Sequence, residues 1–247
     1  MHQLYKKGSF LDDGDRVTDE SHDERITKNL AHISGNMSDA AIKSGRKPED
    51  IVLIGVTKSV SPECISQLIT AGVSNLGENR VQDFLPKYEA IGRPRPNWHF
   101  IGHLQRNKVK FIIDKVVMIH SLDNLSLAIE IDKRAAAIGR TMDVLVEVNI
   151  ADEDTKHGIK PEDTISFADK LGEYGNIRLK GLMCIAPFVE NPEDNRVYFE
   201  KMRNLFLDIK SHDHHNLTEL SMGMSGDYAV AIEEGATMVR IGTALVS

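Results

Sequence analysis

The chain has little of several features that define whole classes of protein. Its 247 residues include only two cysteines, Cys64 and Cys184, which lie far apart and show no CxxC spacing. Neither a disulfide framework nor a cysteine-based zinc site is therefore expected. No run of about 18 apolar residues occurs, and residues 1–20 lack the apolar centre of a signal peptide. Membrane insertion and secretion are disfavoured, so the cytoplasm is the expected location.

Positive charge is also scarce. Lysine and arginine number 30 against 37 aspartates and glutamates, which gives a formal net charge of −7. A protein that binds nucleic acid through its phosphates needs a surplus of positive charge. Nucleic-acid binding is therefore not expected. What the chain does contain, 41% apolar and 27% charged residues, is typical of an ordinary globular domain.

The N-terminal segment differs in composition from the rest of the chain. Residues 1–24 are rich in acidic side chains and cannot bury much apolar surface, so we expect a flexible tail. From Arg25 onward no long linker or shift in composition divides the chain, and residues 25–247 are predicted to form one domain. That domain begins with the apolar stripe of a helix at Ile26, Leu30, Ile33 and Met37.

Short apolar segments then alternate with helical patterns. Ile51–Thr57 is continuously apolar, which is typical of a strand covered on both faces. Seven more strands are predicted at Ser74–Leu76, Asn97–Ile101, Val116–His120, Asp143–Ile150, Arg178–Cys184, Glu219–Met222 and Met238–Ile241. The helical patterns between them include Pro62–Gly72, Asn124–Ile138, Pro161–Glu173, Asn195–Lys210 and Asp227–Glu234.

Eight strand–helix units in about 200 residues predict an α/β fold, a single closed (β/α)8 TIM-type barrel with an extra N-terminal helix. An open doubly wound sheet is the alternative. The first strand lacks the GxGxxG turn that the dinucleotide-binding version of that sheet needs.

Lys58 follows the first predicted strand, which is where a parallel barrel places its reactive residues. Because strands have a period of two, Val52, Ile54 and Val56 point to the same side as this lysine. If that side is the barrel interior, the ammonium is partly desolvated, which favours the free amine that attacks a carbonyl group. We therefore interpret Lys58 as a Schiff-base lysine. The alternative is a lysine that extends into solvent at the end of its strand.

A glycine-rich segment spans the last two strands and the helix between them. Ser225 precedes that helix, and Gly242 and Thr243 follow the final strand. Backbone N–H groups and two hydroxyls from these loops converge where many barrels hold a phosphate. The segment therefore predicts a phosphate site at Ser225, Gly242 and Thr243. Alternatively, Ser225 caps the helix.

Arg240 lies between Val239 and Ile241 in the last strand, so its side chain is expected to point into the barrel. A buried arginine is costly unless other groups accept its hydrogen bonds. Either a ligand or Glu147 on the fifth strand fits that role, and the sequence leaves both open.

An amine, a phosphate site and an interior cation at one end of a barrel suit a small aldehyde that carries a phosphate, and pyridoxal phosphate is the obvious candidate. Several motifs are more specific. They are residues 51–60, GENRVQD at 77–83, WHFIGHLQRNK at 98–108, IHSLD at 119–123, GLMCIAP at 181–187 and LSMGMSGDYAVAIEEGATMVRIGTAL at 220–245. Together they resemble the pyridoxal phosphate homeostasis protein family, whose members resemble the N-terminal barrel of alanine racemase standing alone.

This resemblance implies that pyridoxal 5'-phosphate is held as an aldimine on Lys58, with its phosphate on Ser225, Gly242 and Thr243. Arg240 matches the position that faces the pyridine nitrogen. A permanently charged donor there keeps the nitrogen unprotonated, which weakens the ring as an electron sink. The resemblance also suggests a carrier that supplies the cofactor to apoenzymes, binds related B6 vitamers and lacks robust turnover.

Further expectations stay open. Asn79 matches a family position close to the cofactor, and a helix N-cap is its alternative role. Racemisation needs a base on each face of the substrate, and Lys58 supplies only one of them. Alanine racemase takes the second base from the C-terminal domain of a neighbouring subunit. We expect no counterpart of that domain here, and we expect a monomer. A pyridoxal phosphate-dependent racemase or lyase is the main alternative, and a cofactor-free aldolase acting on a sugar phosphate is the next.

No metal site is predicted. His99 and His103 are four residues apart, but they fall on a strand and the turn after it, without the HExxH glutamate. The helical zinc geometry that this spacing supports therefore does not apply.

Overall fold

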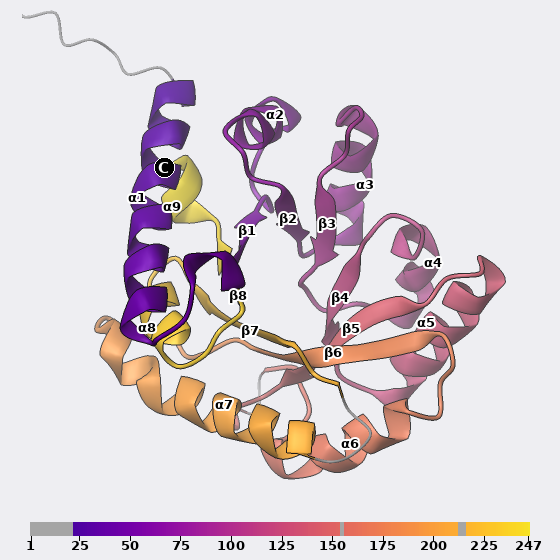
Figure 1. Ribbon diagram of the computed structural model, residues 1–247. Coiled ribbons are helices and arrows are strands. Elements are labelled where there is room, and N and C mark those ends of the chain that lie inside the picture. Colours follow the sequence, from indigo (N-terminus) through magenta and orange to yellow (C-terminus); the bar gives the residue numbers. More distant parts are fainter. Residues whose placement is uncertain (1–21, 154–155, 212–215) are drawn as a thin grey trace, which may run out of the picture.

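The structure, a computed structural model, describes residues 22–153, 156–211 and 216–247. Eight parallel strands pair in chain order, and β8 pairs with β1 to close the sheet (Figure 1). The strands are β1 (Val52–Val56), β2 (Asn75–Glu78), β3 (Asn97–Phe100), β4 (Met118–Leu122), β5 (Met142–Val148), β6 (Ile177–Cys184), β7 (Glu219–Met224) and β8 (Met238–Ile241). The predicted closed barrel is confirmed, and the open sheet is wrong.

Helices connect the strands, as a parallel barrel requires. They are α1 (His22–Lys43), α2 (Pro62–Thr70), α3 (Val81–Ala90), α4 (Val109–Ile112), α5 (Leu125–Ala137), α6 (Thr164–Leu171), α7 (Arg196–Ser211), α8 (Tyr228–Glu233) and α9 (Thr243–Val246). The sequence singled out no pattern for α3, which contains Pro86, or for the short α9. No helix within the described ranges is long and apolar enough to cross a membrane.

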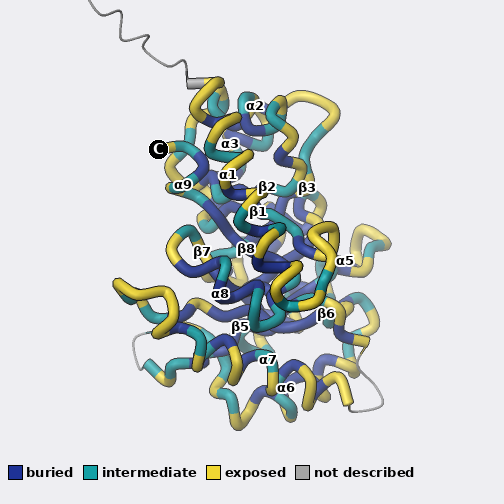
Figure 2. The backbone as a smooth tube through the Cα atoms, turned by 60° about the vertical axis from the view of Figure 1, so that its left-hand side comes forward, coloured by how far each residue is buried: buried dark blue, intermediate teal, exposed yellow. Residues whose placement is uncertain are grey.

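The strand period of two sorts side chains into two cores. Figure 2 shows the buried strands in dark blue at the centre of the molecule. Between strands and helices lies a large apolar cluster that includes Leu53 of β1. Inside the barrel a smaller cluster contains Ile54, with Val52 packed against it. The predicted alternation along β1 is therefore confirmed, because Val52 and Ile54 line the interior.

Helix α1 packs against α8 and α9, at the side of the barrel where β8 meets β1 (Figure 1). It begins at His22, three residues before the expected start, and the rest of the predicted tail lies outside the described residues. Asn36 donates a hydrogen bond to the Tyr228 hydroxyl at 3.0 Å, and Lys43 pairs with Glu233 at 2.8 Å. These contacts fix α8, the helix that follows β7.

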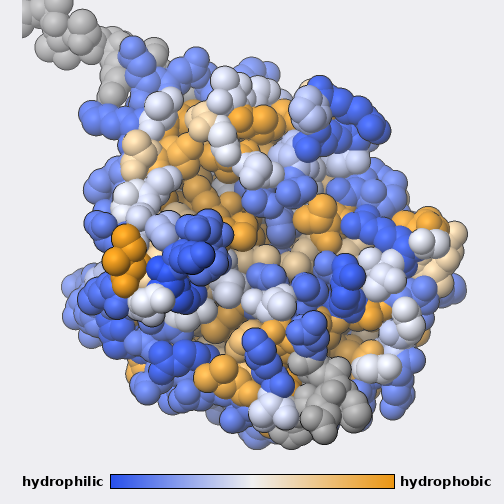
Figure 3. All heavy atoms as spheres, viewed as in Figure 1, coloured by the Kyte–Doolittle hydropathy of each residue, from blue (hydrophilic) through white to orange (hydrophobic). Residues whose placement is uncertain are grey.

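Polar residues cover most of the face seen in Figure 3, and hydrophobic ones form smaller patches between them. A cavity of about 410 Å³ lies under α1, lined by residues such as Leu30, Met37 and Ile51. Its strand residues, Val52 and Asn75, begin β1 and β2. The cavity is therefore at the N-terminal end of the barrel, opposite the rim where the strands end.

Candidate functional site at the carboxyl ends of the strands

The end of β1 places Lys58 in a tight turn. The strand stops at Val56, and the Val60 N–H donates to the Thr57 carbonyl at 3.0 Å. Because the chain leaves the sheet at this turn, the Lys58 side chain is exposed. The predicted desolvation of this lysine is therefore wrong for the structure as it stands, although its place at the C-terminal rim is as expected.

A buried ion pair between Lys87 and Glu78, which the sequence did not reveal, holds the start of this turn in place. Lys87 of α3 donates 2.6 Å hydrogen bonds to both the Thr57 carbonyl and the Glu78 carboxylate. The Thr57 hydroxyl donates to the same carboxylate oxygen at 2.6 Å. Charge-assisted hydrogen bonds of this kind hold their groups in a fixed geometry, so Thr57, the residue before Lys58, is anchored at both its carbonyl and its hydroxyl.

The loops after β7 and β8 are joined by one hydrogen bond. The Gly242 N–H donates to the Ser225 hydroxyl oxygen at 3.3 Å. The N-cap of α8 is Asp227, so the alternative role of Ser225 as a helix cap is wrong. Thr243 is the exposed first residue of α9 and follows directly. The structure thus brings Ser225, Gly242 and Thr243 together.

Gly242 also contacts the end of β1. A Cβ atom at Gly242 would lie 3.3 Å from the Val56 Cβ and 3.4 Å from its carbonyl oxygen. This close approach places the joined loops beside the strand that leads to Lys58. The sequence-predicted phosphate residues and the lysine therefore belong to one continuous part of the rim.

The loop that carries Ser225 is held rigidly. The Asp227 carboxylate accepts a hydrogen bond from the Met224 N–H at 2.7 Å and another from the Asn195 amide at 2.8 Å. Gly223 adopts a φ of +90°, and a Cβ there would lie 2.5 Å from the Ala231 Cβ. Only glycine fits such a position, because its missing Cβ removes both the strain and the clash.

Arg240 points into the barrel at the level of Ile54, its register partner on β1. Its guanidinium donates to the Ser221 hydroxyl oxygen at 2.7 Å and to the Cys184 carbonyl at 2.8 Å. Burial lowers the pKa of Arg240, and the charge of Glu147 is among those that oppose this shift. The interior orientation is confirmed. Its partners are Ser221 and Cys184, so the alternative of Glu147 as hydrogen-bond partner is wrong.

A chain of hydrogen bonds runs from Arg240 across the interior. The His120 Nδ1 lies 3.1 Å from the Ser221 hydroxyl, and its Nε2 lies 3.0 Å from the His99 Nδ1. The His99 Nε2 lies 3.2 Å from the Asn75 side-chain oxygen. That oxygen only accepts, so His99 donates to it, His120 donates to His99, and the Ser221 hydroxyl donates to His120.

Burial keeps both histidines neutral, as this proton order requires. It lowers the pKa of His99 to about 4. The pKa of His120 falls well below its usual range through burial first, then through the charges of His99 and Arg240. From the sequence, His99 was considered only as a possible zinc ligand, and that role was rejected. The strand alternation that places Trp98 and Phe100 in the outer core is the signal that would have placed His99 inside.

Glu147 of β5 is a second buried titratable group in the interior. Its pKa is raised to about 7, mainly by burial and also by the negative charge of Asp123, while the positive charge of Arg240 opposes the shift. Asp123 follows β4 and Arg240 lies on β8, so charges from two sides of the barrel act on the Glu147 carboxylate.

Asn79 follows β2 and faces the loop after β3. A Cβ at Gly102 would lie 2.2 Å from the Asn79 carbonyl oxygen, so these two loops are in close contact. The N-cap of α3 is Arg80, so the alternative role of Asn79 as helix cap is wrong. The Asn79 side-chain oxygen is buried and has no hydrogen-bond partner among the described residues. Such an acceptor gains from any ligand that donates to it.

The comparisons with known proteins agree with this geometry. Residues 30–247 match the family described as alanine racemase, N-terminal domain. A pyridoxal phosphate homeostasis protein of Aquifex aeolicus is 47% identical over 216 residues, which cover 87% of this chain and 95% of that protein. The protein of the same name from Escherichia coli K12 is 37% identical and covers 89% and 95%.

Solved structures give the same picture. A Bifidobacterium adolescentis protein described as unknown has a TM-score of 0.86 at 34% identity, over 93% of this chain and 97% of that one. PipY of Synechococcus elongatus, solved with pyridoxal phosphate bound, has a TM-score of 0.79 at 30% identity, over 90% and 100%. The fold and site thus define a barrel of the alanine racemase N-terminal class. Within that class, the chain belongs to the pyridoxal phosphate homeostasis protein family.

Proposed function

We propose that this protein binds pyridoxal 5'-phosphate through Lys58 and serves in the homeostasis and supply of that cofactor. The observation that carries the proposal is the contact of the loops after β7 and β8 with each other and with the end of β1. The Ser225–Gly242 hydrogen bond joins the two loops, and Gly242 packs against Val56, two residues before Lys58. The lysine and the residues that we propose to hold the phosphate therefore lie on one part of the rim.

The residues present fit this cofactor. Ser225, Gly242 and Thr243 offer hydroxyls and backbone N–H groups, which suit phosphate oxygens. Lys58 is exposed and therefore accessible to an aldehyde. The unpartnered amide oxygen of Asn79 supplies a further polar contact on the neighbouring loop. When bound, pyridoxal phosphate supplies an electrophilic carbonyl and an electron-accepting ring.

Arg240 is the residue that we expect to limit turnover. As the ring-nitrogen partner it can only donate, so it favours an unprotonated nitrogen and a weaker electron sink. Its guanidinium is held by Ser221 and the Cys184 carbonyl, and Ser221 is held in turn by His120. The proposal is therefore a carrier without robust catalytic turnover.

The proposal also includes the oligomeric state, the ligands, the recipient proteins and the location of the protein. All the proposed cofactor residues come from one chain, so a monomer suffices to bind the cofactor. Expected ligands are pyridoxal phosphate and related B6 vitamers, and expected recipients are apoenzymes that need the cofactor. Neither cysteine forms a disulfide and Cys184 is buried, which suits a reducing cytoplasm.

Absorbance titration with pyridoxal phosphate tests the proposal. The wild-type chain is expected to shift the cofactor's absorbance to that of a lysine-bound form with one cofactor per chain. Lys58→Ala is expected to abolish this shift. Lys110→Ala, which removes an exposed lysine of α4, is the matched control and should behave as wild type. An unchanged shift in Lys58→Ala would contradict the proposal.

Two other outcomes would replace the carrier function. Exchange of an amino acid's α-proton with solvent at enzyme-like rates, lost in Lys58→Ala, would indicate a racemase or lyase. Cleavage of a sugar phosphate by the cofactor-free chain, with the sugar trapped on Lys58 by borohydride, would indicate an aldolase.

A further inference from the structure

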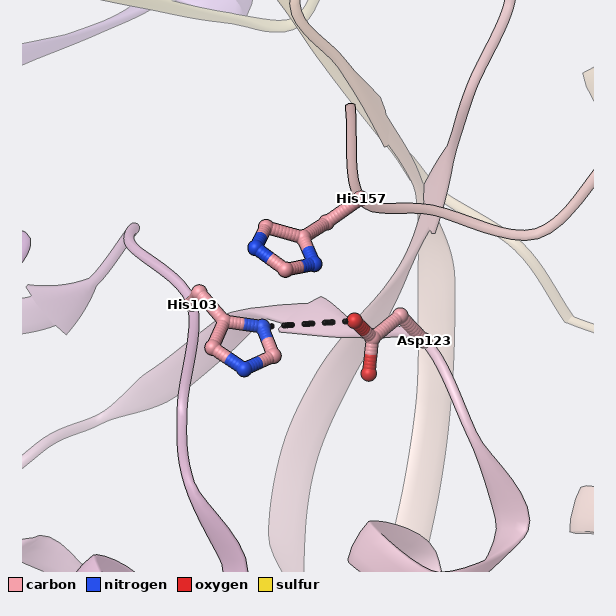
Figure 4. Close-up of side chains that lie close together, drawn as sticks. All are labelled: His103, Asp123 and His157. Carbon is pink, nitrogen blue, oxygen red and sulfur yellow. Dashed lines mark ion pairs between the residues drawn. The ribbon is translucent and has the colours of Figure 1, made fainter. Parts of the chain in front are cut away.

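Three potential metal ligands meet on the other side of the same rim. His103 follows β3, Asp123 follows β4 and His157 follows β5 (Figure 4). One ligand atom from each side chain lies within 4.8 Å of the other two. The His103 Nδ1 is 3.4 Å from the Asp123 Oδ2, and the two imidazole rings stack with their centroids 3.9 Å apart. Residues far apart in the sequence thus form one cluster.

The aspartate is fixed, whereas the histidines are accessible. The Asp123 side chain is 8% exposed, and its Oδ1 accepts a 2.6 Å hydrogen bond from the Asn124 amide. Asn124 is itself fixed as the N-cap of α5, since its oxygen accepts from the Leu127 N–H at 2.9 Å. The other carboxylate oxygen of Asp123, Oδ2, therefore faces His103, whose side chain is 39% exposed.

This arrangement has the parts of a transition-metal site. Two imidazoles and one carboxylate are ligands that zinc and related divalent ions accept, with further positions left to water or another ligand. A second hydrogen bond that orients a ligating carboxylate is a usual feature of such sites, and Asn124 provides it.

The distances require a limited closure. In a tetrahedral zinc site with bonds of about 2.1 Å, the ligand atoms lie about 3.4 Å apart. The His103 Nδ1 and the Asp123 Oδ2 already lie 3.4 Å apart, and all the ligand atoms lie within 4.8 Å of one another. The more distant ligand atoms must therefore approach by up to about 1.4 Å, and the stacked rings must turn apart. Both histidines are exposed and lie on loops, so side-chain rotation can supply this movement.

We propose that His103, Asp123 and His157 form a binding site for one divalent transition-metal ion such as zinc. The site lies after β3, β4 and β5, whereas the proposed cofactor residues follow β7, β8, β1 and β2. It does not depend on the proposed function, because none of its ligands is a proposed cofactor residue.

The sequence alone did not predict this site for a physical reason. Metal motifs are recognised by local spacing, and these ligands are 20 and 34 residues apart along the chain. The pairing of β3, β4 and β5 as neighbours in the sheet brings the three loops together.

Calorimetric titration of the metal-free, untagged full-length chain with zinc chloride, without pyridoxal phosphate, tests the proposal. One zinc ion per chain is expected to bind the wild type. His103→Ala and His157→Ala should each weaken that binding by more than about tenfold. Asn124→Ser keeps a capping oxygen for α5 but removes the amide that orients Asp123, and a loss of about tenfold is expected.

The matched control addresses the other histidine cluster in the sequence. His212, His214 and His215 lie outside the described residues, and a variant with alanine at all three should still bind one zinc ion. The proposal is overturned if the wild type binds no zinc, or if binding is lost in this triple variant and kept in His103→Ala. Because no cofactor is present, either failure leaves the Lys58 experiment unaffected.

Discussion

Two pairs of histidines on the same side of the barrel have opposite environments. His99 and His120 lie in the interior and are 4% and 0% exposed, whereas His103 and His157 lie on the rim and are exposed. His99 and His103 are only four residues apart. The difference arises because β3 ends at Phe100, between them. A histidine before the strand end becomes a neutral part of the core, and one after it stays accessible.

Position relative to a strand end therefore decides what a polar side chain can do. The inner pair has a fixed proton order that reaches Arg240 through Ser221. The outer pair has the 3.4 Å contact with Asp123 and a stacked ring. We therefore expect the inner pair to contribute to stability and to the placement of Arg240, and the outer pair to ligand binding.

The largest expected effect is at His120. His120→Ala leaves a cavity and removes the partners of His99 and Ser221, so the free energy of unfolding should fall by about 3 kcal/mol. Urea denaturation measures this change. The control is His32→Ala on the exposed face of α1, which should alter stability by less than about 0.5 kcal/mol. Equal changes in the two variants would remove the distinction between buried and exposed histidines.

A smaller effect should appear in the pH dependence of stability. His99 has a folded pKa of about 4, below the unfolded value of about 6.5. Its contribution is therefore complete above pH 6.5 and is lost as pH falls toward 4, by about 2 kcal/mol between pH 6.5 and 5. Glu147, with a pKa raised to about 7, acts in the opposite direction over part of this range.

Comparison with His99→Gln isolates this contribution, because Glu147 is present in both proteins. The glutamine side chain would keep hydrogen-bonding groups but cannot titrate. The unfolding free energy of the variant, measured at several pH values, should fall less steeply toward pH 5 than that of the wild type. Parallel curves would show that the inner pair does not titrate as its burial implies.

The smallest expected effect on stability is at the outer pair. His157→Phe keeps an aromatic ring against His103 but removes both ring nitrogens. Because the side chain is exposed, the unfolding free energy should change by less than about 0.5 kcal/mol. Thermal or urea unfolding in the absence of metal measures it. A loss comparable to that of His120→Ala would place the outer pair in the structural core instead.

Much of the fold followed from local patterns in the sequence. Buried parallel strands are continuously apolar, and the limits of β8 were predicted correctly at both ends. The starts of β3, β7 and α2 and the end of β6 were also predicted correctly. Most other boundaries shifted by one to three residues, because side-chain pattern does not reveal where backbone pairing stops. Helix α3 was missed since Pro86 interrupts its pattern, yet its Lys87 forms the buried ion pair with Glu78.

The candidate site was predictable to the extent that it depends on strand ends. Loops after adjacent strands must meet in a parallel barrel, which grouped Lys58, Ser225 and Gly242 without coordinates. Side-chain exposure was not predictable, because the turn after Val56 decides it, and Lys58 is exposed as a result. The hydrogen-bond partners of Arg240 were also not predictable, since Ser221 lies on β7 and the Cys184 carbonyl on β6, and the sequence does not state the register of these strands.

Borohydride reduction of the full-length chain with bound pyridoxal phosphate, followed by peptide mass mapping, is the most direct test of the central claim. Reduction converts a lysine–cofactor bond into a stable one, so the modified residue can be identified. The account predicts the added cofactor mass on the peptide that contains Lys58, at close to one per chain. Modification of a different lysine, or none at all with the cofactor present in excess, would contradict it.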